Sequence, residues 1–305
     1  EDGIRDRSPS RGLGDVYKRQ VLDAVCQVAS QAGQVILEIY DQAYEVIEKA
    51  DGSPVTVADH RAHDLISEKL APILPGTPVL SEESPDINYP QRADWSRFWL
   101  VDPLDGTKEF IRRNGEFTVN IGLIENGFPI LGVVHTPVRR TTHFAVTGGG
   151  AWRQVEAATA KMITIRPYHD GVVRMVASRS HSGAEVDRFR NSLRAQSGQE
   201  VETVSMGSAL KVCLVAEGAA DVYPRLGPTS EWDTGASHCI LNEAGGFLMD
   251  CRGNELQYNK PSVLNPWFLA VGDTSYDWIN VCPVSYTHLR AHETDSYLVC
   301  RLLLE

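Results

Sequence analysis

Two aspartates, Asp102 and Asp105, stand directly after an apolar run at residues 98–101. The run predicts a short buried strand that ends at the first aspartate. Pro103 restricts the backbone between the two carboxylates, and Gly106 follows without a side chain. Carboxylates held on a stiff turn at a strand end are typical ligands of a hard cation such as Mg²⁺. The spacing therefore indicates a metal site.

The next residues predict an anion site beside that metal site. The Leu104 carbonyl offers a further oxygen ligand, and a helical pattern opens at Gly106 and runs to Arg113. The first N–H groups of a helix have no partner within it and attract anions. A cation beside a phosphate cradle is the minimum equipment for metal-assisted phosphoryl transfer to water. The alternative is a simple turn, because Asp-Pro and Asp-Gly pairs are common turn formers.

Further acidic residues are candidates for the same site. Glu82 and Glu83 follow a short apolar segment. Neighbouring side chains on an extended chain point in opposite directions, so we expect only one of them to reach the cation, and we favour Glu82. Asp59 and Asp233 each begin a helical pattern. Taken alone, the glutamates indicate a solvated loop and the two aspartates indicate helix N-caps.

Composition restricts the class of protein. The chain has 305 residues, 42% of them hydrophobic, and a formal charge of -11, which allows one large domain or two smaller ones. The acidic balance argues against a nucleic-acid polymer as partner, and no apolar run is long enough for a transmembrane segment. The glycine motifs of P-loop and dinucleotide-binding proteins are missing. Six scattered cysteines without a CxxC pair predict reduced thiols, with neither disulfides nor a zinc site.

The two ends differ from the rest of the sequence. Residues 1–20 are polar and aperiodic, and residues 282–305 have no clear pattern. Both resemble translated adapter sequence, so we exclude them from the expected fold and expect the natural protein to begin near Val21. The first residues lack the apolar segment of a secretory signal. This favours a cytoplasmic protein, with peripheral association with the inner membrane left open.

The remaining chain predicts two halves that meet near residues 167–171. In residues 21–168, two amphipathic helices precede strand patterns, and Asn126-Gly127 is a strong hairpin signal. This half is predicted to be α+β, with helices on a largely antiparallel sheet. In residues 169–281, short strands alternate with helices, which predicts an α/β layer.

Several motifs, taken in order, resemble one family. They are D-x-S-P-V-T-x-A-D at 51–59, Glu82-Glu83, D-P-L-D-G-T-K-E-F at 102–110, R-N-G-E-F-T-V-N at 113–120, S-R-S-H at 178–181, L-K-V-C-L-V-A-E-G at 210–218, Y-P-R at 223–225 and Trp232-Asp233. Together they are similar to the signature of the inositol-monophosphatase-like, lithium-sensitive phosphatases. The finer detail resembles the bacterial 3'(2'),5'-bisphosphate nucleotidase branch, over about residues 21–271.

The resemblance implies a role for each acidic residue. Two or three Mg²⁺ ions would be held by Glu82, Asp102, the Leu104 carbonyl, Asp105 and Asp233. Asp59 with Thr107 would orient and deprotonate the attacking water. The backbone amides of Gly106, Thr107 and Lys108 would hold the phosphate.

The contacts with the rest of the substrate are implied less directly. Ser180 and His181 resemble the segment that meets the nucleoside, while Lys211 and Arg225 are candidates for a second phosphate. Asp233 would lie against the substrate as well as the metal. The alternative for the basic residues is an ordinary surface position. His60 and His63 are expected to face solvent, and His238 is expected to be structural.

The resemblance also implies the fold and the reaction. The fold would be a layered α-β-α-β-α sandwich of the sugar-phosphatase type. The expected substrate is a small phosphate ester, 3'-phosphoadenosine 5'-phosphate, hydrolysed to AMP and phosphate by a monomer or homodimer. One alternative is a phosphatase for inositol monophosphate or another sugar phosphate. The other is a non-catalytic nucleotide-binding regulator, which the presence of Asp59, Thr107 and the metal carboxylates disfavours.

Overall fold

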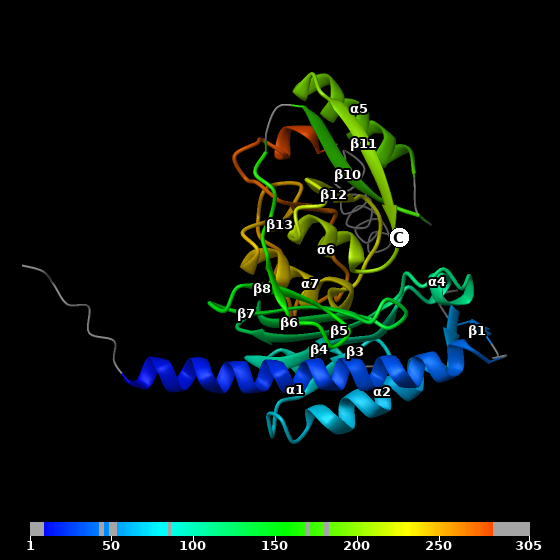
Figure 1. Ribbon diagram of the computed structural model, residues 1–305, viewed down its shortest axis with the longest axis vertical. Helices are drawn as coiled ribbons and strands as arrows, with labels where there is room; N and C mark the ends of the chain where they lie inside the picture. Colours follow the sequence, from blue (N-terminus) through cyan, green and yellow to red (C-terminus); the bar gives the residue numbers. More distant parts are fainter. Residues whose placement is uncertain are drawn as a thin grey trace, which may run out of the picture.

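The computed structural model describes residues 9–42, 46–48, 54–84, 87–168, 171–179 and 183–282. Helices and sheets alternate in five layers, which Figure 1 shows from the outer helices at the bottom to another helix at the top. Each sheet is covered by helices on both faces, so its apolar side chains are removed from water on both sides. The predicted α-β-α-β-α sandwich is confirmed.

The first helical layer lies on a seven-stranded sheet. The helices are α1 (Pro9–Tyr40) and α2 (Val57–Leu70). The sheet has the order β3 (Val79–Ser81), β4 (Arg97–Asp105), β5 (Thr118–Glu125), β6 (Phe128–Thr136), β7 (Thr141–Val146), β8 (Ala151–Val155) and β9 (Lys161–Ile163). Only β3 and β4 pair in parallel, and every other neighbouring pair is antiparallel. The largely antiparallel sheet predicted for this half is therefore present.

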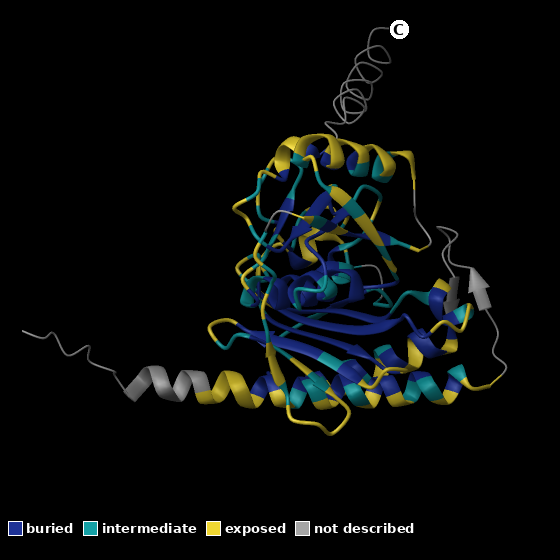
Figure 2. Cartoon of the chain, turned by 45° about the horizontal axis from the view of Figure 1, so that its top comes forward, coloured by how far each residue is buried: buried dark blue, intermediate teal, exposed yellow. Residues whose placement is uncertain are grey.

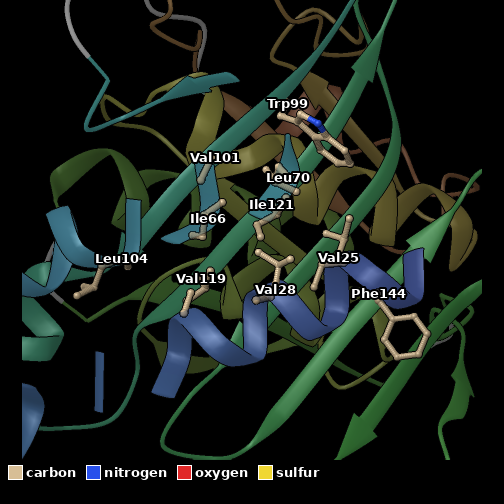
Figure 3. Packing of buried hydrophobic residues seen from close by; sticks show 14 of the residues in the cluster. Val25, Val28, Ile66, Leu70, Trp99, Val101, Leu104, Val119, Ile121 and Phe144 are labelled. Carbon is tan, nitrogen blue, oxygen red and sulfur yellow. The ribbon is translucent and has the colours of Figure 1, made fainter. Parts of the chain in front are cut away.

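One apolar core joins these two layers. Val25 and Val28 of α1 and Ile66 of α2 meet Val101 and Ile121 of the sheet (Figure 3). All five side chains are at most 5% exposed. The opposite faces of the outer helices remain exposed (Figure 2), as expected for amphipathic helices on a sheet.

α1 extends further toward the N-terminus than the sequence indicated. The helix already includes residues 9–20, which we had excluded from the fold. Val16 and Tyr17 are 56% and 55% exposed, and the first side chains that join the core are those of Val21 and Leu22. The segment thus continues the helix, while the hydrophobic packing begins near Val21.

The middle layer consists of α6 (Leu210–Ala216) and α7 (Glu231–Glu243). α7 belongs to the second half of the chain but packs closely on the first sheet. A Cβ atom at Gly132 would lie 2.0 Å from the Ala236 carbonyl oxygen, and one at Gly235 would lie 2.6 Å from Leu100 Cδ2. Glycine at these positions allows the helix and the sheet to approach. Packing therefore requires a residue without a side chain at both positions, although glycine has a low helix propensity.

The second sheet has five strands, in the order β11 (Glu200–Met206), β10 (Val172–Ser178), β12 (Val222–Arg225), β14 (Phe268–Val271) and β13 (Phe247–Asp250). The β11-β10-β12 part is parallel, and β14 pairs antiparallel with β12 and β13. α5 (Ala184–Ser197) covers its outer face, where Phe189 and Leu193 are fully buried. Only β14 runs against the other strands, because it follows β13 with no helix between them.

Short elements complete the described chain. They are β1 (Val46–Glu48), β2 (Pro54–Thr56), α3 (Tyr89–Arg92), α4 (Thr107–Ile111) and the 3-10 helix η1 (Ile279–Val281). Val57 begins α2 directly after β2, and β9 was not predicted from the sequence. Asn126 and Gly127 form the predicted hairpin turn with φ of 51° and 84°.

The cysteine prediction is wrong at one pair. Cys251 and Cys282 form a disulfide that joins the residue after β13 to the residue after η1. Cys26, Cys213 and Cys239 are free, and Cys300 lies outside the described residues. The pair is separated by 31 residues and has no CxxC spacing, so only the fold reveals that the two residues meet.

Candidate active site

A bulge in β4 directs both aspartates toward one site. We expected the strand to end at Asp102, but it continues to Asp105. Asp102 pairs with Asn120 and Asp105 with Thr118, so β4 contains one residue more than β5 between these pairs. In a regular strand, residues three apart point to opposite faces. The extra residue, which lies between Asp102 and Asp105, cancels that difference and lets the two carboxylates influence each other.

Three carboxylates form a cluster with the geometry of a metal site. One carboxylate oxygen from each of Glu82, Asp102 and Asp233 lies within 4.8 Å of the others. Glu82 arrives there because β3 runs parallel to β4, and its N–H donates to the Val101 carbonyl at 3.2 Å. Glu83 instead approaches the His60 ring at 3.7 Å. The structure therefore brings together Glu82, the glutamate that we favoured, and the aspartates Asp102 and Asp233.

Burial and mutual repulsion act on the charges in this cluster. Burial, then the neighbouring Glu82 and Asp105 carboxylates, raise the pKa of Asp102 well above its usual range. Burial and the Asp105 carboxylate raise the pKa of Asp233 to about 7. Oxygen ligands, burial and mutual repulsion together match the requirements of a divalent cation, so the residues fit Mg²⁺.

Asp105 lies beside this cluster and is anchored more firmly. Its Oδ2 accepts hydrogen bonds from the Ala209 N–H at 2.6 Å and from Asn120 Nδ2 at 3.2 Å. The Leu104 carbonyl oxygen lies 3.5 Å from Thr107 Oγ1, slightly farther than the Asp59 carboxylate that competes for the same hydroxyl hydrogen. Asp105 and Leu104 thus remain predicted metal ligands at the margin of the cluster. Asn120 and Ala209 were missed, although a polar residue in the apolar run of β5 was a visible signal for the first.

Asp59 and Thr107 lie within hydrogen-bonding distance of each other. Thr107 Oγ1 lies 3.4 Å from Asp59 Oδ1. Asp59 Oδ2 accepts from both the N–H and the Oγ1 of Thr56, at 2.8 and 2.7 Å. Burial raises the pKa of Asp59, which strengthens the carboxylate as a base. Two elements distant in sequence therefore supply the predicted carboxylate-hydroxyl pair.

The N-cap interpretation of Asp59 and Asp233 is wrong by three positions. Thr56 is the N-cap of α2 and Ser230 is the N-cap of α7, and each aspartate is the N3 residue of a capping box. Asp233 Oδ2 accepts from the Ser230 N–H at 2.9 Å. In this position one carboxylate oxygen fixes the helix start while the side chain reaches the site.

The helix that follows Gly106 is shorter than predicted. α4 ends at Ile111, and Arg113 has a φ of 57°, so the helix does not reach that residue. Gly106 adopts a φ of 95° just before the helix, a conformation that favours glycine. Thr107 and the exposed Lys108 line the cleft next to it.

A cavity of about 200 Å³ connects these groups with basic residues of the second half. Lys211 and Arg225 both line it, as do Tyr223 and Thr229, which sequence reasoning had not singled out. Lys211 is 8% exposed, and burial lowers its pKa to about 8. Its Nζ donates to the Ser208 carbonyl at 2.6 Å and lies 5.5 Å from the centre of the Tyr223 ring.

The other predicted contacts have different outcomes. Arg225 donates to the Pro228 carbonyl at 2.7 Å. Ser180 and His181 lie outside the described residues. His63 does not simply face solvent, since its Nδ1 lies 2.9 Å from Ser81 Oγ. His238 is fully buried against Tyr258, in keeping with a structural position.

A family model described as inositol monophosphatase family matches residues 17–271. The chain belongs to the inositol monophosphatase family. It is 49% identical to the 3'(2'),5'-bisphosphate nucleotidase CysQ of Escherichia coli (strain K12) over 251 residues, which is 81% of this chain and 98% of that protein. The corresponding CysQ of Haemophilus influenzae is 36% identical over 262 residues, 86% of this chain and 96% of that protein.

Solved structures agree with this assignment. The crystal structure of CysQ from Bacteroides thetaiotaomicron has 42% sequence identity and a TM-score of 0.73, and the match covers 84% of this chain and 97% of that one. An IMPase from Thermotoga maritima, 23% identical, has a TM-score of 0.68 over 86% of this chain and 96% of its own, and shows the fold alone. The resemblance inferred from the motifs, including its branch, is confirmed.

Proposed function

We propose that this protein is a Mg²⁺-dependent 3'(2'),5'-bisphosphate nucleotidase that hydrolyses 3'-phosphoadenosine 5'-phosphate to AMP and phosphate. The observation that carries the proposal is the cluster of Glu82, Asp102 and Asp233, because Glu82 and Asp233 line the same cavity as Lys211 and Arg225. A phosphomonoester needs the acidic cluster for its metal, and a second phosphate needs the basic residues. The similarity to nucleotidases named CysQ supports the same substrate.

The positions of the residues indicate which of them would hold the metal ions and which would hold the phosphate. Glu82, Asp102 and Asp233, with Asp105 and the Leu104 carbonyl at the margin, would hold two or three Mg²⁺ ions. Bound Mg²⁺ would supply Lewis-acid stabilisation of the charge that develops on the phosphoryl oxygens. The backbone amides of Gly106, Thr107 and Lys108 would orient the phosphate from the other side.

Asp59 and Thr107 would handle the proton of the attacking water. Thr107 Oγ1 donates its hydrogen toward Asp59 Oδ1, so its lone pairs remain for a water hydrogen. A proton that leaves the water can then pass through the hydroxyl to the buried carboxylate. Lys211, Arg225, Ser180 and His181 are assigned to the second phosphate and the nucleoside.

The remaining properties follow from the same assignment. We infer inhibition by Li⁺, a cytoplasmic location with peripheral membrane association left open, and a monomer or homodimer. Within the described part of the chain, no helix is both long and apolar enough to cross a membrane.

Phosphate release from the full chain tests the proposal. The substrates are 3'-phosphoadenosine 5'-phosphate and inositol 1-phosphate, each with Mg²⁺ and with chelator, and Asp102→Asn is the matched control. We expect Mg²⁺-dependent release with a preference for the bisphosphate, and loss of release in the variant. Preference for the inositol ester would replace the substrate assignment with that of a sugar-phosphate phosphatase. No release from either ester would contradict the proposal.

A further inference from the structure

Glu116 is a buried carboxylate that lies outside the predicted site but is held from three sides. Arg179 donates to both of its oxygens, at 3.1 Å from Nε and 2.9 Å from Nη2. Arg139 approaches Glu116 Oε1 at 3.6 Å, and the Gly207 N–H donates to Oε2 at 2.9 Å. The carboxylate thus ties the segment after α4 to the end of β10 and to the residues before α6.

The Gly207 contact leads directly to the cleft. Two residues further on, the Ala209 N–H donates to Asp105 Oδ2, and the Ser208 carbonyl accepts from Lys211 Nζ. One short segment therefore fixes both a carboxylate beside the metal cluster and a lysine in the cavity. The position of residues 207–209 therefore depends on the hydrogen bond between Glu116 and the Gly207 N–H.

The backbone shows that this placement is tight. A Cβ atom at Gly207 would lie 2.6 Å from the Glu116 carbonyl oxygen. A Cβ atom at Gly106, the residue that precedes α4, would lie 3.3 Å from the same oxygen. Glu116 is thus packed between the phosphate cradle and the segment that carries Ala209, and a shift of its backbone would move both.

We propose that Glu116, clamped by Arg179, is a positioning residue that sets Asp105 and Lys211 through residues 207–209. Removing the clamp weakens recognition of a second phosphate more than recognition of a single phosphate, because Lys211 loses the fixed Ser208 carbonyl. This specificity claim rests on the proposed function. The effect on Asp105 does not depend on the identity of the ester.

The test compares Glu116→Gln with a matched variant elsewhere. Asp221 is 4% exposed, accepts from Arg166 at 2.9 and 2.5 Å and from the Arg174 N–H at 2.6 Å, and is not among the residues that line the cavity. Asp221→Asn therefore removes a similar buried clamp and provides the control. Arg179→Met is a milder second variant, because the Arg179 side chain is 46% exposed.

Two readouts are needed for each variant. Hydrogen exchange of the Gly207 and Ala209 amides requires no substrate, and we expect it to be about tenfold faster in Glu116→Gln and unchanged in Asp221→Asn. The ratio of kcat/KM for 3'-phosphoadenosine 5'-phosphate to that for adenosine 3'-phosphate, which keeps the scissile ester but lacks the second phosphate, should fall about tenfold in Glu116→Gln. It should fall less in Arg179→Met and remain constant in Asp221→Asn.

The outcomes separate this inference from the proposed function. Unchanged exchange, or faster exchange with an unchanged ratio, overturns the positioning role. If the wild type has no preference for the bisphosphate, the proposed function fails and the comparison uses whichever ester is hydrolysed. A drop in kcat/KM for that ester in Glu116→Gln beyond the drop in Asp221→Asn then supports the inference, and equal drops overturn it.

Discussion

α2 and α7 begin with the same local device in different surroundings. Each has an aspartate at N3 whose Oδ2 accepts from the backbone N–H of the N-cap residue. α2 lies in an outer layer, and the Val57 side chain at its first position is 49% exposed. α7 lies between two sheets, and the Glu231 side chain at its first position is fully buried and paired with Lys260.

This difference separates two uses of one capping box. Asp59 turns its second oxygen toward a hydroxyl, Thr107 Oγ1, whereas Asp233 joins two further carboxylates. The first arrangement suits proton transfer and the second suits a cation. The sequence context is similar at both helix starts, so the surroundings decide the chemistry.

The largest effects are expected when either of the two aspartates, Asp59 or Asp233, is substituted. Asp59→Asn and Asp233→Asn each keep an oxygen for the N-cap N–H, so both should fold. Asp59→Asn should lower kcat by about 10³-fold with little change in the Mg²⁺ concentration at half-maximal rate. Asp233→Asn should raise that Mg²⁺ concentration. Phosphate release across a Mg²⁺ titration measures both, and the same response in the two variants would contradict the division of roles.

The second prediction tests the burial of α7. Gly132→Ala places a methyl group against the Ala236 carbonyl, which is backbone and cannot move away without shifting the helix. We expect the free energy of unfolding to fall by about 3 kcal/mol in urea denaturation. Gly227→Ala is the control, since nothing lies within 4 Å of its Cβ position. Equal stabilities of the two variants would show that α7 can move away from the added methyl group without loss of stability.

The third prediction concerns His135 and the stability of the protein at acidic pH. Burial lowers the pKa of His135 from 6.5 to about 4. Asp23, Arg140 and Glu156 line the same cavity, but burial is the cause of the lowering. Below about pH 6.5, His135 is protonated in the unfolded chain but remains neutral in the folded protein. The free energy of unfolding therefore falls as the pH is lowered toward about 4.

The total loss from this group approaches about 3 kcal/mol. Urea denaturation at several pH values in this window should show a shallower pH dependence for His135→Gln than for the wild type. His238, a buried residue of α7, also has a lowered pKa, but the nearby Glu255 carboxylate opposes the effect of burial. Identical slopes for His135→Gln and the wild type would assign the acid sensitivity to other groups.

The smallest effect is expected at the N-cap of α2. Thr56→Ala removes the acceptor for the Ala58 N–H and the donor to Asp59 Oδ2. The free energy of unfolding should fall by about 1 kcal/mol. Because Asp59 also loses an orienting contact, kcat should fall by roughly threefold to tenfold. Thr56→Ser keeps both hydrogen bonds and should have the kcat of the wild type. If Thr56→Ala also had the kcat of the wild type, the N-cap would have no influence on the reaction.

Much of the architecture was accessible from local patterns. Hydrophobic periodicity predicted the central strands of the first sheet, from β4 to β7, and the alternation in the second half, because the burial of one face repeats along the sequence. The motifs also identified Glu82, Asp102 and Asp233 before their proximity was known. Their joining depends on the parallel pairing of β3 with β4 and on the packing of α7, which are long-range events.

Other features had no sequence signal of their own. The β4 bulge depends on how Asp102 and Asp105 pair with β5. The capping positions differ by three residues from the simple N-cap interpretation, since a helix start is fixed by dihedral angles that a pattern does not resolve. The Ala209 contact with Asp105 comes from a backbone N–H, which every residue except proline possesses.

The most direct test of the account is calorimetric titration of Mg²⁺ into the metal-free full chain. Wild type, Glu82→Gln and Asp102→Asn would be compared in the same buffer, with Asp221→Asn as the control. If the three clustered carboxylates form the metal site, the wild type and the control bind Mg²⁺ and both cluster variants bind at least about tenfold more weakly. Equal Mg²⁺ binding by all four proteins would contradict the account, because the clustered carboxylates would then not be the ligands.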